Sequence, residues 1–483
     1  MTIKELNPSI VWNNFYQLTQ QPRPSKHEEK VREFLLKWGK EHNIDTRTDD
    51  TGNVIMRVPA TPGYENRKGI ILQGHMDMVP QKVASSKHDF LTDPIETVID
   101  GEWVTANGTT LGADNGMGVA MVMSVAESKD VKHGPIEILV TYDEETGMTG
   151  AKSLKPGVLK GDILLNLDSE DEEELCIGCA GGLDAEAVFK YKTERGRNLV
   201  AHKLTVKGLQ GGHSGMDISL YRANANKVAA NALVGVVEQK GVQIAKFTGG
   251  SLRNAIPFEA EVIFLIPKGK ERSVLSAVRK RLAASKDIYK ESDPGMQFSI
   301  EKLGAESRFV EHKVALNLLK ALMACPSNVE RMSQSMKGLT ETSINMAIVR
   351  TEKGRILVHS LMRSAIDEAK AELAEKVRFI FEMAGAKISF AGGYSGWKPN
   401  PESSLIALLD NIHKEKFGKG MNVMATHGGL ECAIMGAAYP NWEMISIGPT
   451  VKYPHSPDER CFIPSVGRSW EFLKAILENA PEK

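Results

Sequence analysis

The chain has 483 residues, of which 42% are hydrophobic and 25% charged, a composition typical of globular enzymes and unlike that of disordered or fibrous chains. Its 60 basic and 61 acidic side chains leave a formal charge of -1, so no global field attracts nucleic acid or anionic lipid. We therefore expect no nucleic-acid partner and no membrane partner. The length favours two domains, because a single core rarely grows beyond about 300 residues.

The N-terminus and the cysteines indicate the cellular compartment. The first ten residues include Lys4, Glu5 and Pro8 and lack the long apolar core of a secretory signal, and no apolar run is long enough to cross a bilayer. Five cysteines are too few and too scattered for a disulfide framework, which predicts a reducing cytoplasm. Cys176 and Cys179 form a CxxC, but without a second ligand pair at similar spacing we interpret them as buried thiols.

The N-terminal part of the chain alternates helical and strand-like patterns. Apolar residues at helical spacing over 10–40, interrupted by Pro22 and Pro24, predict two opening helices. Apolar runs then predict four strands, and a helix over 116–127 falls between two of them. This alternation indicates an α/β sheet. The expected strands cover 53–59, 69–74, 136–142 and 162–167.

From residue 199 the pattern changes to strand–helix–strand units, which indicates an α+β insertion. Its expected elements are strands over 203–207, 242–247 and 260–266, helices over 223–239, 271–284, 314–323 and 366–383, and a hairpin of 343–349 with 355–361 about Lys353-Gly354. A helix over 404–417 and an apolar run over 442–447 return to the first pattern. We predict a discontinuous metal-binding catalytic domain, 1–184 with 396–483, and an inserted lid domain, 185–395.

Five polar clusters lie just beyond an apolar strand or at the start of a helix. In open α/β sheets, ligands bind outside the carboxyl ends of the strands, so five loops could converge on one site. Each cluster alone has an ordinary explanation as a turn or a solvated surface, and their joint placement is what favours a site. The clusters cover 74–77, 112–116, 143–147, 168–170 and 453–456.

The residue types in these clusters indicate metal chemistry. Two histidines and three carboxylates form a nitrogen and oxygen set suited to zinc, manganese or cobalt, and five ligands exceed what one catalytic zinc uses. The excess predicts two divalent ions that share a carboxylate. His75 and Asp77 point to the same face of an extended strand, so Asp77 could fix the imidazole tautomer. Glu144 and Glu145 face opposite ways, so one could bind metal while the other acts as a general base.

The five motifs closely resemble those of the carnosinase-type dipeptidases, members of the dinuclear zinc metallopeptidase family. The likeness covers nearly the whole chain in motif order and length. It rests on GHMDMV from Gly74, LGADNG from Leu111, DEETG from Asp143, NLDSE from Asn166 and PHSP from Pro454. It implies an α/β, mixed-sheet catalytic domain with helices on both faces, and a ferredoxin-like lid.

The resemblance also implies a role for each site residue. It makes Asp114 the bridge between two Zn²⁺ ions, with Co²⁺ or Mn²⁺ as alternatives. Glu144 becomes the general base, with Asp77 as the second catalytic residue that orients a ligand. The implied ligands are His75 and Asp168 for one ion, and Glu145 and His455 for the other.

Four further residues are implied to contact the substrate. His213 lies in the glycine-rich segment 211–215, whose other explanation is a hairpin turn, and it would stabilise the tetrahedral oxyanion. Arg363 suits a peptide's terminal carboxylate because its guanidinium can bind both oxygens, although a surface salt bridge is the ordinary alternative. Asn254 would contact the substrate. Gly429 lies just before a predicted helix, where backbone N–H groups could hold part of the substrate, and the alternative is an ordinary helix start.

The implied reaction is hydrolysis of dipeptides, with an Xaa-His preference that includes β-alanyl-histidine. A homodimer is expected, and the sequence leaves open whether His213 serves its own site or its partner's. The first alternative is an N-deacylase or carboxypeptidase of the same family, which acylated substrates would distinguish. The second is a module that binds metal or peptide without turnover, and the presence of Glu144 argues against it because a purely structural site needs no base.

Overall fold

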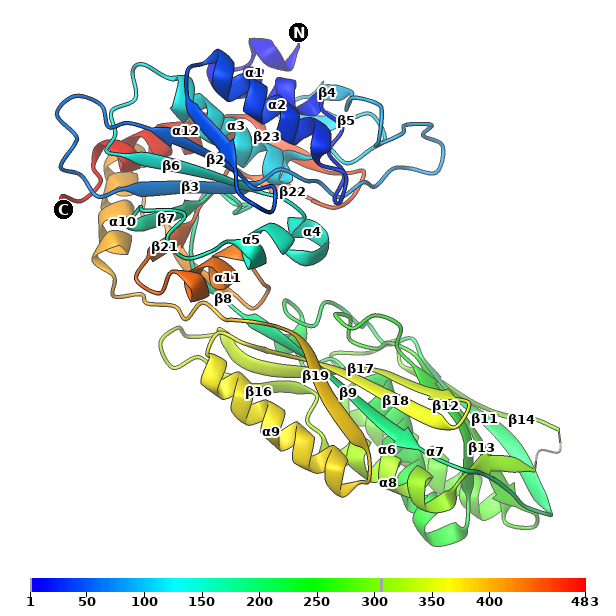
Figure 1. The fold of residues 1–483 in the computed structure, drawn as a ribbon. Coiled ribbons are helices and arrows are strands. Elements are labelled where there is room, and N and C mark those ends of the chain that lie inside the picture. Colours follow the sequence, from blue (N-terminus) through cyan, green and yellow to red (C-terminus); the bar gives the residue numbers. More distant parts are fainter. Residues whose placement is uncertain (1, 305–306) are drawn as a thin grey trace. The chain divides into compact units, whose positions relative to one another are not determined.

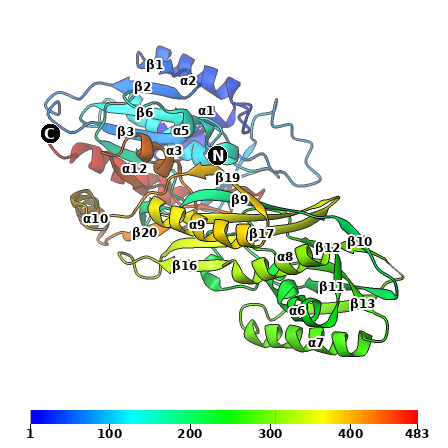
Figure 2. The same cartoon turned by 60° about the horizontal axis from the view of Figure 1, so that its bottom comes forward.

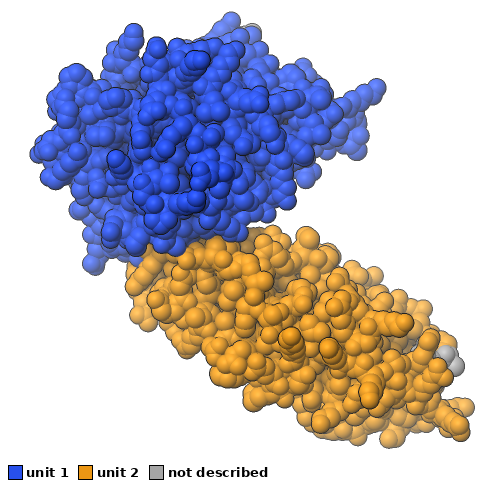
Figure 3. Space-filling model, viewed as in Figure 1, with its two compact units in different colours: residues 1–178, 399–425, 430–483 blue, residues 179–398, 426–429 orange. Residues whose placement is uncertain are grey.

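The computed structural model describes residues 2–304 and 307–483 and divides the chain into two compact units (Figure 3). Unit 1 comprises Met1–Gly178, Pro399–Ala425 and Leu430–Lys483, and unit 2 comprises Cys179–Lys398 with Thr426–Gly429. The domain boundaries predicted after residues 184 and 395 remain predictions. Among the described residues, no helix combines the length and the apolar character needed to span a membrane.

Unit 1 is built on a mixed eight-stranded sheet (Figure 1). Its four inner strands β6, β3, β7 and β21 are parallel, and β1, β2 and β8 pair antiparallel with their neighbours. Strands β3 and β6 are buried along their whole length, which is why they read as continuous apolar runs. In sheet order the strands are β1 Asp45–Thr48, β2 Val54–Val58, β6 Ile136–Thr141, β3 Ile70–His75, β7 Ile163–Asn166, β21 Glu443–Ser446, β8 Glu174–Cys179 and β20 Asn422–Thr426.

Helices cover both faces of this sheet, with α1, α2 and α3 on one side and α5 and α11 on the other (Figure 1). Helix α3 packs closely against the residue that follows β7, because position 118 is glycine. A Cβ at this position would lie only 2.3 Å from the Leu167 carbonyl oxygen. The helical elements are η1 Ile3–Glu5, α1 Ser9–Thr19, α2 Glu29–Glu41, α3 Ala113–Glu127, α4 Glu144–Gly147, α5 Thr149–Ser153, α10 Ser404–Phe417, α11 Glu431–Ala438 and α12 Ile463–Glu478.

A second, four-stranded sheet in unit 1 was not predicted from the sequence. Its strands are too short to give an alternating pattern, and they come from two segments far apart in the chain. Their antiparallel pairing holds the segment between β22 and β23, which includes His455, against the segment before α3. In order they are β22 Val451–Lys452, β23 Arg460–Phe462, β5 Trp103–Ala106 and β4 Thr97–Asp100.

Unit 2 is an antiparallel sheet with helices α6, α7, α8 and α9 on one side (Figures 1 and 2). The larger of two core clusters among its described residues joins buried residues of the sheet, such as Phe247 and Phe264, to Leu233 of α6 and Phe381 of α9. Strands β17 and β18 form the predicted hairpin, in which Glu352 pairs with Arg355 across Lys353-Gly354.

The elements of unit 2 follow the predicted strand–helix order. Its sheet holds β14 Gln297–Lys302, β11 Leu199–Lys207, β13 Ala260–Pro267, β12 Gln243–Gly249, β17 Thr340–Glu352, β18 Arg355–Ser364, β9 Gly181–Lys190 and β19 Lys387–Tyr394, with β16 Asn328–Met332 beside β17. Its helices are η2 Ile218–Leu220, α6 Ala225–Lys240, α7 Glu271–Ile288, α8 His312–Ala324 and α9 Asp367–Met383, and β10 Thr193–Arg195 pairs with β15 Arg308–Val310.

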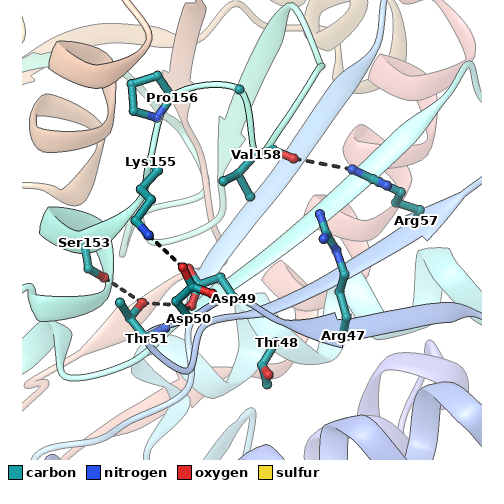
Figure 4. Close-up of a pocket in the computed structure, with 11 residues that line it drawn as sticks. Arg47, Thr48, Asp49, Asp50, Thr51, Arg57, Ser153, Lys155, Pro156 and Val158 are labelled. Carbon is teal, nitrogen blue, oxygen red and sulfur yellow. Dashed lines mark hydrogen bonds and ion pairs between the residues drawn. The ribbon is translucent and has the colours of Figure 1, made fainter.

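A surface pocket of about 440 Å³ lies beside the β1–β2 turn of unit 1 (Figure 4). Lys155 pairs with Asp50 at 2.6 Å across it, and Arg57 donates to the Val158 carbonyl at 3.4 Å. The pocket is open and its charges are mixed, and none of its lining residues belongs to the five polar clusters. This pocket is therefore separate from the five polar clusters.

Candidate metal centre and substrate-contact residues

The parallel strands of unit 1 deliver the predicted ligands to one edge of the sheet. His75 is the last residue of β3, Glu145 lies four residues beyond β6, and Asp168 lies two residues beyond β7. Parallel neighbours end at the same edge, so these side chains come together although they lie far apart in the sequence. The two remaining ligands, Asp114 of α3 and His455 of the β22–β23 segment, reach the same place.

The five predicted ligands form two overlapping donor groups. Nε2 of His75 lies 3.1 Å from Oδ1 of Asp114 and 3.4 Å from Oδ1 of Asp168. Nε2 of His455 lies 3.1 Å from Oδ2 of Asp114 and 3.0 Å from Oε2 of Glu145. In each group, ligand atoms of all members lie within 4.8 Å of one another. Asp114 belongs to both groups, one oxygen facing each histidine, which is the arrangement a bridging carboxylate needs.

Asp77 orients both the first ligand and the following glutamates. It is fully buried, and its Oδ1 lies 3.3 Å from Nδ1 of His75, so the ring nitrogen turned towards the donor groups is Nε2. Its two oxygens also accept the backbone N–H groups of Glu144 at 3.0 Å and Glu145 at 3.2 Å. One carboxylate thus fixes an imidazole and the backbone of α4.

Glu144 lies against the same site without belonging to either of the two triads that share Asp114. It is partly buried and forms a third donor group with His75 and Glu145. Desolvation raises its pKa well above the ordinary value against the attraction of His75, and repulsion from Asp168 and Glu431 adds to the rise. A carboxyl group with a raised pKa is suited to taking up and giving back a proton.

Three of the predicted ligands, Asp168, His75 and His455, have strongly perturbed pKa values. Burial raises the pKa of Asp168 to about 7, against the attraction of His75. Desolvation would lower the pKa of His75, but Asp168, Asp114 and Asp77 outweigh it and raise that pKa well above its usual range. Hydrogen bonds to Asp114 and Glu145 raise the pKa of His455 to about 11. Each histidine is surrounded by more negative charge than it can balance.

These donors fit divalent cations. Oδ1 of Asp168 is buried and accepts no hydrogen bond in the described part of the chain, and it lies within the cluster, 3.4 Å from Nε2 of His75. Imidazole nitrogens and carboxylate oxygens are the ligands that zinc, manganese and cobalt share. Positive charge at the cluster would relieve the repulsion that raises the pKa values of Asp168 and Glu144.

Several buried residues around this cluster were not identified from the sequence. Glu431, at the start of α11, accepts from Gln73 and Thr141 at 2.6 Å, and burial raises its pKa to about 8. Glu459 and Arg23 bind the backbone of the segment that bears Asp114. Their partners lie too far away in the sequence for any motif to pair them; Glu459 contacts residues up to 348 positions earlier.

The residues predicted to contact the substrate form a second cluster, which lies in unit 2. Nδ1 of His213 accepts the N–H groups of Met216 at 3.1 Å and Gly215 at 3.3 Å, so the neutral ring carries its proton on Nε2. Desolvation, and next the charge of Arg363, lower the pKa of His213. The residue therefore offers an N–H donor and no charge. Ser214 N–H donates to the Asn254 carbonyl at 2.8 Å, while the Asn254 residue is exposed.

Arg363 of β18 lies at the centre of this second cluster and is 6% exposed. It forms no ion pair with any described residue; its contacts are with hydroxyl groups, Nε to Ser214 at 3.4 Å and Nη1 to Tyr394 at 3.5 Å. This is unlike the salt-bridged surface arginine considered above. Gly429 completes the cluster, because a Cβ there would lie 2.7 Å from the Tyr394 hydroxyl.

His427, in the same cluster, was not singled out by the sequence. It is 6% exposed, and its Nε2 lies 2.7 Å from the Ser343 hydroxyl. Desolvation, and next the charge of Arg363, lower its pKa to about 3. The second cluster thus contains one buried guanidinium and two histidines with lowered pKa values, in contrast to the carboxylates of unit 1.

The profile of peptidase family M20/M25/M40 matches residues 71–479, a span that includes all five clusters. With this fold and donor set, the chain belongs to that family, so it is a peptidase and a hydrolase. The predicted membership of this metallopeptidase family and the mixed-sheet fold are confirmed.

Two proteins resemble this chain over its full length. The chain is 39% identical to the cytosol non-specific dipeptidase of Escherichia coli (strain K12), over 100% of this chain and 99% of the relative. Its structure resembles the crystal structure of aminoacylhistidine dipeptidase from Vibrio alginolyticus, with a TM-score of 0.94 and 43% sequence identity. The match covers 100% of this chain and 99% of that chain. The aminopeptidase PepT of Bacillus cereus, 17% identical with a TM-score of 0.58 over 98% of each chain, shares the fold.

Proposed function

We propose that the protein is a metal-dependent dipeptidase that hydrolyses short peptides at the carboxylate cluster of unit 1. The observation that carries the proposal is that two donor groups share Asp114, because a shared carboxylate is what a pair of metal ions requires. The names of the two full-length relatives support dipeptides as the substrate class. A preference for Xaa-His, including β-alanyl-histidine, follows the Vibrio relative.

In this proposal Asp114 would be shared by two ions, His75 and Asp168 would complete the ligands of one, and Glu145 and His455 would complete those of the other. Zinc is the proposed metal, and manganese and cobalt suit the same donors. When bound, such a pair supplies Lewis acidity that polarises the scissile carbonyl and acidifies the attacking water. Asp77 keeps Nε2 of His75 directed at the cluster through its contact with Nδ1.

Glu144 is the proposed general base and acid. Its carboxylate takes a proton from water as the water oxygen bonds to the peptide carbonyl carbon. The same carboxyl group returns the proton to the amine nitrogen as the C–N bond breaks, so a dipeptide gives two amino acids, one with the new carboxyl group and the other with the freed amine. Its raised pKa favours the uptake of the proton, because the protonated form is stable in its partly buried position.

The second cluster has proposed substrate roles. Nε2–H of His213 donates to the developing oxyanion, and Arg363 binds the terminal carboxylate of the peptide with the fork of its guanidinium. Asn254 and Gly429 are further proposed contacts. The support for Arg363 is its burial without a carboxylate partner among the described residues.

A panel of free and N-acylated dipeptides tests the proposed activity. The purified protein is stripped with a chelator, supplied with zinc or manganese, and assayed for released amino acids. Turnover of the free dipeptides alone is the expected result, whereas turnover of the acylated forms alone would indicate an N-deacylase. Calorimetric titration should saturate at two metal equivalents per chain, and full activity at one equivalent would contradict the paired site.

The proposal also includes a cytoplasmic homodimer. The E. coli relative carries the word cytosol in its name, which supports the compartment. Sedimentation equilibrium should give twice the 53.0 kDa mass of the chain. A single-chain mass at micromolar concentration would contradict the dimer without affecting the proposed chemistry.

A further inference from the structure

Glu459 is a buried carboxylate whose partners are backbone N–H groups of the segment that bears Asp114. It is 2% exposed. Its Oε2 accepts the N–H groups of Leu111 at 2.8 Å and Gly112 at 2.9 Å, and its Oε1 accepts those of Ala113 at 2.7 Å and Asp114 at 3.2 Å. Four donors on one carboxylate leave this stretch of backbone little freedom to rotate.

The same contacts lie at the irregular start of helix α3. Asp114 and Asn115 have non-helical backbone angles there, and Gly112, the residue before the helix, has no side chain that could accept an N–H group. Glu459 accepts these N–H groups from a distant part of the chain. Asp114 lies within this irregular stretch, so the carboxylate acts directly on its backbone.

Arg23 holds the carbonyl side of the same segment. It is 2% exposed, and its guanidinium donates to the Gly112 carbonyl and, at 3.1 Å and 3.0 Å, to the carbonyls of Met76 and Asp77. It thereby ties the segment after β3, which bears His75, to the segment before Asp114. Gly112 is required at the junction, because its φ is 71° and a Cβ would lie 2.6 Å from the Arg23 guanidinium.

We infer that Glu459 and Arg23 are positioning residues that hold the backbone of residues 111–114 in the conformation that presents Asp114 to both metal ions. They act from opposite sides, Glu459 on the N–H groups and Arg23 on the carbonyls. Glu459 also lies four residues beyond His455, so the same carboxylate couples the turn that bears His455 to the bridge. The inference rests on the proposed metal site, and it predicts that the segment is ordered before any metal binds.

The variant Glu459→Gln tests this inference, because the amide keeps the size of the side chain but has only one oxygen to accept N–H groups. The matched control is Glu137→Gln. Glu137 is a buried carboxylate of β6 that accepts the N–H groups of Lys160 and Gly161, and it lies at the opposite end of the strand from Asp143. Both substitutions remove hydrogen bonds between a carboxylate and backbone N–H groups, but only Glu459→Gln affects the segment that bears Asp114.

Two measurements distinguish a positioning role of Glu459 from a general contribution to the stability of the fold. In metal-stripped protein, hydrogen exchange of amides 111–114 should be slow in the parent and in Glu137→Gln but at least about 10-fold faster in Glu459→Gln. Calorimetry should show roughly 10- to 100-fold weaker metal binding in Glu459→Gln, the usual cost of losing a group that orients a ligand, and no more than a twofold change in the control. Excess metal should restore most of the turnover number.

The variant Arg23→Lys provides a second test that keeps the positive charge. One ammonium group cannot reach the three carbonyls that the guanidinium fork holds, so faster exchange and weaker metal binding are expected again. The inference is overturned if these amides exchange rapidly in the metal-stripped parent, or if Glu459→Gln binds both ions with parental affinity. A parent that binds no divalent ion would refute the proposed function instead, and the exchange measurement would still report on the segment.

Discussion

The two clusters differ in the sign of their excess buried charge, which is negative in unit 1 and positive in unit 2. The cluster of unit 1 gathers carboxylates, including Asp114 and Asp168, around His75, and burial, together with repulsion between the carboxylates, raises the pKa values of Asp168 and Glu144. The cluster of unit 2 gathers Arg363 with hydroxyl groups and two histidines whose pKa values burial lowers. The first is prepared for cations and the second for anions and hydrogen-bond acceptors, so metal content and substrate binding should be separable by mutation.

The largest effect is expected at the carboxylate cluster. Glu144→Gln should lower turnover by about 100- to 10,000-fold, because the amide keeps the shape of the side chain but cannot accept a proton. Metal content, measured by mass spectrometry, should stay at the parental value. The neighbouring variant Glu145→Gln is the control and should lose metal as well as activity. Near-parental turnover in metal-replete Glu144→Gln would assign the base to another residue.

A smaller loss of turnover is expected in unit 2. His213→Ala removes a donor directed at charge that develops in the transition state, so turnover should fall by roughly 100- to 1,000-fold while metal content is unchanged. The control is His359→Ala, a change to a half-exposed histidine on β18 that pairs with Glu186. If His213→Ala hydrolyses dipeptides at the parental rate, the residue only shapes its turn.

Substrate affinity, rather than turnover, should respond to Arg363. Its removal leaves the substrate carboxylate unpaired, which costs about 1.5 to 3 kcal/mol and corresponds to a KM raised by roughly 10- to 150-fold in Arg363→Ala. Arg355→Ala, on the exposed end of the same strand, should leave KM unchanged. A large fall in melting temperature with an unaltered KM would show that Arg363 supports the fold instead of the substrate.

The smallest expected effect concerns acid stability, and it tests whether unit 2 buries a neutral histidine. The pKa of His427 is about 3 in the folded protein, below its value of about 6.5 in the unfolded chain. The unfolded chain therefore takes up the proton first, and stability is lost as the pH falls from about 6.5 towards 3.

The difference in unfolding free energy between pH 7 and pH 5 should be about 2 kcal/mol smaller in His427→Gln than in the parent. Urea unfolding followed by the circular dichroism of the helices measures this difference. The exposed His27→Gln should behave as the parent does. Equal pH dependence in all three proteins would mean that His427 is protonated in the folded state at pH 5.

The sequence predicts best where the physical signal is local. The buried strands β3 and β6 and helices such as α6 have long apolar patterns, and the residues that follow β3, β6 and β7 meet because parallel strands end together. The two-residue strand β22 has no such pattern, and its pairing depends on partners in a distant part of the chain. For the same reason Glu459 and Arg23 could not be identified. Glu459 contacts the backbone, and an N–H group is the same for every residue type, so nothing in segment 111–114 marks the partner that it needs.

The position of His455 and Glu459 late in the chain, opposite ligands that come early, has a consequence for synthesis on the ribosome. Unit 2 is nearly continuous in sequence, but unit 1 is completed only by residues that follow it. At translation rates of 5 to 20 residues per second, His455 emerges roughly 20 to 80 seconds after His75. During that interval the nascent chain holds His75, Asp114, Glu145 and Asp168 without the fifth donor, His455, and without Glu459. Completion of the second donor group therefore has to follow release of the C-terminal segment.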